Sequence, residues 1–296
     1  MTAGGFVHEP AEATLAGIVD LARRGELRLA ARMAETVASR TPPESPEAIP
    51  LANIRGGVAF ERGQLDLAET CFESAIRLAH DRNEPLLAAK ASSNLGSIAH
   101  LRGKAVLAAS LYHGALQTYR AAEDAVGEAQ AEHNLGLVER ERGDLEAAGL
   151  HAARAVAAAR RSGDFGLIGL SLTGAAESAV GLGEVQGARR FLLLAAGFAR
   201  EANDPLGRVE VSRVEALLAL HLGHFDIALT KASRGYLVSH RLGSLQLAGE
   251  CAALCARAST RLNRLRLAAG FRSRALRCFR SIGALGALHR LSSEMA

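Results

Sequence analysis

The sequence predicts an all-α protein, a solenoid of seven helical hairpins followed by a C-terminal capping helix. A turn motif, Gly-x-apolar-x-x-Ala, recurs at spacings of 38 residues once and 40 residues five times. A second marker, mostly acidic, repeats with the same period, and two independent markers at one period are typical of a solenoid. Aromatic residues make up only 4% of the chain, so strands are not expected. The first marker begins at Gly25, Gly63, Gly103, Gly143, Gly183, Gly223 and Asn263, and the second falls at Glu84, Asp124, Asp164, Asp204, Ser244 and Ala284.

The stretch from residue 127 to residue 164 shows one hairpin in full. Apolar residues recur at helical spacing on both sides of a short break that contains Gly143. Glycine suits the positive φ that a reversal needs, and Asp144 and Asp164 can cap the helices that follow them. Pro85 and Pro205 suit a helix first turn. The sequence therefore predicts helix breaks near every turn glycine.

The repeats divide most of the chain. Their expected bounds are about 11–48, 49–88, 89–128, 129–168, 169–208, 209–248 and 249–288, all within one solenoid covering 11–296. Residues 1–10 are predicted to be a disordered tail, and 284–296 a capping helix that covers the last apolar face. A proline-rich connection at 41–50 is expected to be the most flexible linker inside the array.

The hairpins resemble tetratricopeptide repeats (TPRs). The matching residues are Leu95-Gly96, Gly103, Ala108, Tyr112 and Ala115 in the third repeat, and Leu135-Gly136, Gly143, Ala148 and Ala155 in the fourth. The usual period is about 34 residues, and the longer unit is similar to that of Pins/LGN-type adaptors and MalT-like bacterial regulators. The resemblance covers about residues 11–288 and implies a right-handed superhelix. Arg55 and Glu215 depart from it, because they stand where Leu95 and Leu135 stand.

The resemblance also implies a concave groove lined by the first helix of each hairpin. Mapped onto the third and fourth repeats, its partner-binding positions include Lys90, Asn94, His133, Asn134 and Arg140. Asparagine amides can grip the backbone of an extended peptide, whereas Lys90 and Arg140 could hold acidic side chains. His133 is expected to gain charge below about pH 6.5. Alternatively, the two asparagines cap or pack locally with no ligand.

The groove is predicted to be less polar in the fifth and sixth repeats. Its equivalent positions hold Leu170, Val180, Leu217 and Leu220. These could accept apolar side chains or an amphipathic helix. They could equally pack against one another or form a self-association surface, so homo-oligomerisation stays open.

Charge is unevenly distributed along the chain. Residues 1–150 carry 15 basic and 21 acidic side chains, whereas residues 151–296 carry 20 and 10. Eight arginines and no acid lie between Arg257 and Arg280. This cluster could bind nucleic acid or an anionic surface. We favour a solvated outer face, because no aromatic platform accompanies these arginines beyond Phe271 and Phe279, which are spaced as core residues. The chain also has 32 arginines against three lysines, which indicates base bias in a GC-rich bacterial genome.

The four cysteines are interpreted as core residues. Cys251 and Cys255 lie one turn apart, and Cys278 could approach them, so the three could in principle form a metal or redox site. Earlier repeats place Val211 and Val238 in the columns of Cys251 and Cys278, which favours apolar packing. No metal and no cofactor are expected.

The sequence favours binding over catalysis. No nucleophile has a base at a supportable spacing, so the protein is predicted not to be an enzyme. Neither a leader segment nor a membrane-spanning run is recognised, and a cytoplasmic location is expected. The leading hypothesis is an adaptor that binds a peptide or protein partner with acidic residues. The alternatives are a ligand-sensing or peptide-sensing regulatory module and a nucleic-acid-binding protein.

Overall fold

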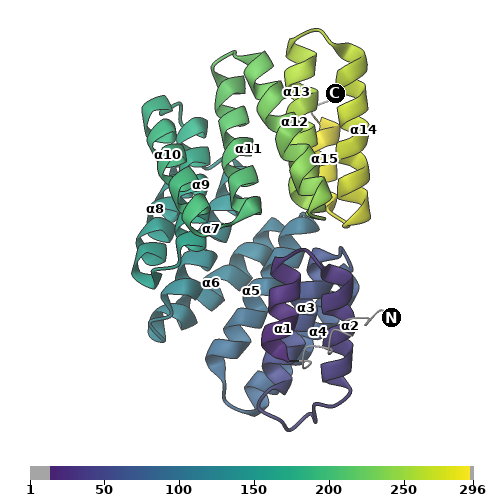
Figure 1. The fold of residues 1–296 in the computed structure, drawn as a ribbon. Helices are drawn as coiled ribbons and strands as arrows, with labels where there is room; N and C mark the ends of the chain where they lie inside the picture. Colours follow the sequence, from purple (N-terminus) through teal and green to yellow (C-terminus); the bar gives the residue numbers. More distant parts are fainter. Residues whose placement is uncertain (1–13, 294–296) are drawn as a thin grey trace, which may run out of the picture. The chain divides into compact units, whose positions relative to one another are not determined.

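The computed structural model describes residues 14–293. Within that range the chain forms fifteen α-helices and no strand, so the predicted all-α class is confirmed. The predicted tail at 1–10, and residues 294–296 of the predicted cap, lie outside the described residues. The helices are α1 (Leu15–Arg23), α2 (Leu27–Ala38), α3 (Ala48–Glu61), α4 (Leu65–Asp81), α5 (Pro85–Leu101), α6 (Ala105–Ala121), α7 (Ala125–Arg142), α8 (Leu145–Ser162), α9 (Phe165–Gly181), α10 (Val185–Glu201), α11 (Pro205–His221), α12 (Phe225–Arg241), α13 (Leu245–Arg261), α14 (Leu265–Ser281) and α15 (Leu285–Ser293) (Figure 1).

The helices form two compact units. The first ends at Ala91 and contains α1 to α4 with the start of α5, and the second begins at Ser92 and runs to α15. Within the units, neighbouring helices pack as hairpins: α3 with α4, α7 with α8, α9 with α10, α11 with α12 and α13 with α14. A single solenoid over 11–296 remains a prediction.

The turns explain both sequence markers. Every glycine of the first marker has positive φ, and Asn263 takes the same conformation at φ 57°. The predicted helix breaks are therefore confirmed. Three members of the second marker cap helices, and so does Asp144 beside Gly143. The side chains of Asp124, Asp144, Asp164 and Asp204 each accept a hydrogen bond from the backbone N–H three residues later, at 2.9–3.1 Å.

Close packing explains why glycine stands at position 96 of the third repeat. Tyr112, which is only 1% exposed, lies directly against Gly96 of the preceding helix. A Cβ on Gly96 would lie 2.7 Å from the tyrosine Cε1, so only glycine leaves room for the ring. The Tyr112 hydroxyl donates a hydrogen bond to Ser97 at 3.1 Å, which satisfies this buried polar group.

The two departures from the repeat pattern are accommodated by ion pairs. Arg55 donates to Glu35 at 2.9 Å, and Lys231 donates to Glu215 at 2.6 Å. Helices α3 and α11 continue through these positions. The charged side chains therefore replace apolar contacts with polar ones and leave the repeat register unchanged.

All four cysteines are buried, which confirms their assignment to core positions. Cys251 and Cys255 are fully buried within the apolar packing of the second unit. Burial raises the pKa of the Cys255 thiol to about 11, so this group stays a thiol at neutral pH.

The proline-rich connection at 41–50 is held by Arg82, the residue that directly follows α4. Arg82 donates hydrogen bonds to the carbonyl oxygens of Ser45, at 2.6 Å, and Pro43. Both contacts lie inside the first unit, and they anchor the connection that the sequence predicts to be the most flexible linker.

Helix α15 confirms the predicted cap and extends it. Ala284 and Leu291 are buried in the same apolar cluster as Phe279 of α14. The helix also reaches back to the turn after α5: a Cβ on Gly286 would lie 3.2 Å from the Cα of Gly103. The path of the second unit therefore returns to its first helix.

Across residues 14–293, no helix combines the length and apolar character needed to cross a bilayer.

Candidate functional site

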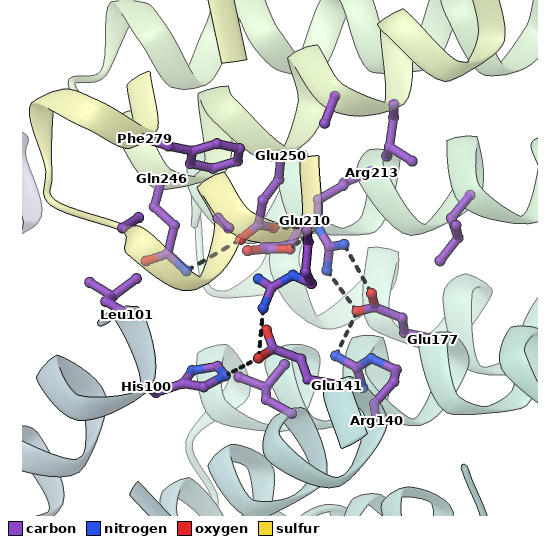
Figure 2. Close-up of a pocket in the computed structure, with 18 of the residues that line it drawn as sticks. His100, Leu101, Arg140, Glu141, Glu177, Glu210, Arg213, Gln246, Glu250 and Phe279 are labelled. Atoms are coloured by element: carbon purple, nitrogen blue, oxygen red, sulfur yellow. Dashed lines mark hydrogen bonds and ion pairs between the residues drawn. The ribbon is translucent and has the colours of Figure 1, made fainter. Parts of the chain in front are cut away.

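The second unit contains a cleft lined by the first helix of each of its hairpins. One cavity there has a volume of about 360 Å³ and is walled by side chains from α5, α7, α9, α11, α13 and α15, with Phe279 from α14 (Figure 2). Its charged walls hold four arginines and four glutamates, namely Arg140, Arg213, Arg257, Arg290, Glu141, Glu177, Glu210 and Glu250. The arrangement agrees with the groove that the resemblance to tetratricopeptide repeats implies.

Arg213 of α11 is the centre of a buried charge network. Its guanidinium donates to Glu177 at 2.7 and 3.1 Å and to Glu210 at 2.8 Å, and it lies 3.3 Å from Glu250 (Figure 2). The Arg213 side chain is only 12% exposed. Burial opposes its charge, but the three carboxylates raise the pKa of Arg213 above its usual value.

Glu177 joins this centre to the fourth repeat. Its carboxylate accepts hydrogen bonds from Arg140 of α7, at 3.1 Å, as well as from Arg213. Burial would raise the pKa of Glu177, yet the two guanidinium groups together lower it to about 2. The carboxylate is therefore ionised at any physiological pH, and it ties three successive first helices together.

Glu250 of α13 is in a different electrostatic situation. Burial, the largest influence, raises its pKa, and the charges of Glu210 and Glu177 add to that effect against Arg213. Gln246 donates to the Glu250 carboxylate at 3.2 Å. This end of the cleft therefore has an excess of carboxylate over guanidinium groups.

A second network connects α15 with the start of the unit. Glu141 of α7 lies 3.0 Å from His100 Nε2 of α5 (Figure 2). The same carboxylate lies 2.7 Å from Arg290 of α15. Burial opposes ionisation of Glu141, but His100 and Arg290 hold its pKa below the usual value. The ion pair and the Gly103–Gly286 approach together fix α15 across the cleft.

His133 lies beside Gly174, where the absence of a side chain makes room for the imidazole. A Cβ on Gly174 would lie 2.9 Å from His133 Nδ1. Burial, followed by the charge of Arg140, lowers the pKa of His133 to about 4. The expected gain of charge below pH 6.5 is therefore wrong, because the folded environment keeps this imidazole neutral until well below that pH.

The structure brings only two of the five predicted partner-binding residues into the cleft. His133 and Arg140 line it, whereas Asn94, on α5, and Asn134, on α7, are not among its wall residues. Lys90 belongs to the first unit. Arg140 is engaged by Glu177, so the expected positive patch is partly neutralised. Binding by all five residues remains a prediction.

Sequence reasoning missed the charged centre, although a signal was present. Glu210 and Glu250 occupy the same repeat column as Lys90, at multiples of 40 residues, and Arg213 shares the column of His133. These columns hold groove positions in the third and fourth repeats, so the same columns in later repeats place these three side chains in the groove.

The apolar residues expected in the later repeats do line the cleft. Leu170 and Leu217 contribute to the first cavity. Val180, Leu217 and Leu220 contribute to a second one of about 760 Å³. This second cavity also receives Arg257, Arg261 and Arg272 from the arginine-rich segment.

Three of the eight arginines in that segment are engaged within the second unit. Arg261 stacks over Phe225 at 4.6 Å from the ring centroid, and Arg274 stacks over Phe271 at 4.8 Å. Arg264 pairs with Asp226 at 3.1 Å. Phe271 and Phe279 are buried, which confirms that they pack in the core and offer no stacking platform for bases.

Comparisons with known proteins support the fold and assign no family. No family model matches the sequence, and neither does any curated protein. Among solved structures, the Rap conjugation gene regulator of plasmid pLS20, in complex with the Phr* peptide, is similar at 15% identity and TM-score 0.74, covering 95% of this chain and 80% of that one. The apo form of RapI is similar at 13% identity and TM-score 0.69, covering 91% and 97%.

A third neighbour is aspartyl phosphate phosphatase F from Bacillus subtilis, at 10% identity and TM-score 0.57, covering 93% of this chain and 96% of that chain. Together these likenesses show that the chain has a TPR-like helical-repeat fold. At such low identity they define the class of architecture alone.

Proposed function

We propose that this protein is a non-enzymatic adaptor that binds a short peptide, or an extended segment of a partner protein, in the cleft of its second unit. The observation that carries the proposal is the cleft itself, walled by successive first helices with both charged and apolar side chains. Ion pairs such as Arg213–Glu177 hold those walls before a ligand arrives, so less ordering entropy is lost on binding. The peptide-bound Rap regulator has a similar fold, which supports this choice.

Binding is favoured over catalysis because the charged groups in the cleft are arranged as a scaffold. Arg140, Glu177 and Arg213 satisfy one another, which positions the helices and leaves none of the three available as a general acid or base. His133 and Arg140 are proposed to face the ligand. Asn94, Asn134 and Lys90 complete the hypothesis drawn from the repeat pattern, with a partner that carries acidic residues.

A regulatory module is the second candidate, and α15 favours it. This helix lies across the cleft, held by Arg290 on Glu141 and by the approach of Gly286 to Gly103. A ligand that enters the cleft would change those contacts, and this would couple occupancy to the position of the C-terminal helix. This candidate keeps the predicted similarity to MalT-like regulators as a hypothesis.

Blocking the cleft tests the proposal. Leu217→Trp places a large ring where both cavities meet, whereas Leu193→Trp adds the same ring to a side chain on α10 that is 74% exposed. Each full-length variant is used as bait beside the wild type, after its helical circular dichroism is matched. We expect a partner that is retained by the wild type and by Leu193→Trp and lost from Leu217→Trp.

Calorimetric titration with the identified partner then gives its affinity. A partner retained equally by all three baits would refute binding in the cleft. A steep loss of affinity with salt and competition by nucleic acid would instead support the arginine-rich face.

A further inference from the structure

The two cavities of the second unit form one continuous cleft. They share six wall residues, namely Arg140, Glu177, Leu217, Ala253, Arg257 and Leu291. The cleft therefore has two ends, one beside the N-terminal half of α13 and one beside its C-terminal half. The chemistry of these ends differs.

The first end is acidic. Glu210 and Glu250 both face Arg213, which is also bound by Glu177. Arg140 balances part of the charge on Glu177, but the two carboxylates of Glu210 and Glu250 still share the single guanidinium group of Arg213. A cationic group brought by a ligand would find an acceptor here that is already partly desolvated.

The second end is basic. Arg257, Arg261 and Arg272 line it, and Glu177, already paired with two arginines, is its only acidic wall residue within 14–293. Over the same described range, Arg257 and Arg272 make no ion pair. Arg261 is held by the ring of Phe225, which leaves its N–H donors available. A carboxylate would therefore meet several uncompensated guanidinium groups.

An apolar stretch separates the ends. Leu217 belongs to both cavities, and Val180 and Leu220 continue toward the arginines. Along α13, Glu250 and Arg257 are seven residues apart, about 10 Å at the helical rise. An extended peptide of about four or five residues spans that distance and leaves room for the Glu250 and Arg257 side chains, which project from the helix into the cleft.

We propose that the cleft fixes the direction of a short peptide, with its amino terminus at Glu210 and Glu250 and its carboxyl terminus at Arg257 and Arg272. The central side chains of such a peptide would be apolar and lie on Leu217 and Leu220. This inference rests on the proposed function and adds the chemistry and polarity of the ligand. It also makes both free ends part of recognition.

The test uses peptide end groups as probes. A library of pentapeptides with apolar central residues is prepared in four forms: free at both ends, N-acetylated, C-amidated, and blocked at both ends. The full-length protein selects binders, which are identified by mass spectrometry and then titrated singly. We expect the free form to bind best, with C-amidation and N-acetylation each weakening binding about tenfold or more, as the loss of a charge-assisted contact does.

Variants assign each end of the peptide to its side chains. Arg257→Gln with Arg272→Gln should remove most of the preference for a free carboxylate and keep the preference for a free amine. Glu250→Gln with Glu210→Gln should do the reverse. Arg280→Gln, an exposed arginine on α14 outside both cavities, is the matched control and should keep both preferences. Because each preference is a ratio measured within one variant, partial loss of folded protein does not change it.

The two levels of the hypothesis fail differently. Peptides that bind with no regard to their ends, or preferences that survive the matching substitutions, would overturn the assigned direction and leave peptide binding in place. A library in which no form binds would overturn the assigned direction, whereas the proposed function is overturned separately, by a partner that the Leu217→Trp bait retains as well as the wild type does.

Discussion

Replacing Arg213 with Met should cost about 3–5 kcal/mol of stability, because it leaves buried carboxylates without their partner. The guanidinium lies 2.7 Å from Glu177, 2.8 Å from Glu210 and 3.3 Å from Glu250, with 12% of its side chain exposed. The lowered pKa of Glu177 agrees with this size, because a change from 4.5 to about 2 corresponds to about 3 kcal/mol, shared between Arg213 and Arg140.

The same pKa sets the pH dependence. Glu177 has a lower pKa in the folded protein than in the unfolded chain. Its contribution to stability is therefore complete above about pH 4.5 and is lost as the pH falls toward about 2. In Arg213→Met most of that contribution is absent, so the variant should lose less stability over this pH interval than the wild type does.

Urea unfolding followed by helical circular dichroism at pH 7 and pH 3 measures both effects. The matched control is Arg264→Met, which removes an ion pair to Asp226 whose side chains are 52% and 70% exposed and should cost less than about 1 kcal/mol. A double-mutant cycle with Glu177→Gln isolates the coupling, expected at about 1–3 kcal/mol. The reasoning is refuted if Arg213→Met costs no more than Arg264→Met, or if the cycle shows no coupling.

Three further outcomes are expected. His133→Gln should flatten the dependence of stability on pH between about 6.5 and 4, because the depressed pKa of this imidazole makes the wild type lose stability as the pH falls through that window; an unchanged urea-unfolding profile would contradict this. Gly286→Val should speed hydrogen exchange throughout α15, since its side chain meets the backbone of Gly103, whereas Gly270→Val, which has open space around it, should not. Asn94→Ala with Asn134→Ala should weaken partner binding by about 1–3 kcal/mol in a calorimetric titration, with unchanged affinity confining recognition to the residues that line the cleft.

The repeats could be predicted from the sequence because their causes are local. A positive φ at Gly143 and the cap formed by Asp164 depend on a few neighbouring residues, and the period multiplies each such signal across the chain. The burial of Cys251 followed from its column in the same way. Because these features recur with the repeat period, a correct prediction of one hairpin extends to the others.

The candidate site could be predicted only in part, because its decisive contacts join helices far apart in the sequence. Arg140 and His133 stand at partner-binding positions that the resemblance to tetratricopeptide repeats implies. The neutrality of His133 depends on burial and on the charge of Arg140. Neither can be predicted from the position of His133 in the repeat. The pairing of Arg290 with Glu141 joins residues 149 positions apart, and only the path of the folded chain shows that they meet.

The return of α15 has a consequence for how this protein can evolve. Open repeat arrays gain or lose units readily, because each unit contacts only its neighbours. In the second unit, one more hairpin between α7 and α13 would push the last helix away from Gly103 by about 10 Å, the usual distance between packed helices. It would also break the link to Glu141. Duplication or deletion of a hairpin in this unit is therefore expected to disrupt both contacts, whereas a change in hairpin number before α5 would leave them in place.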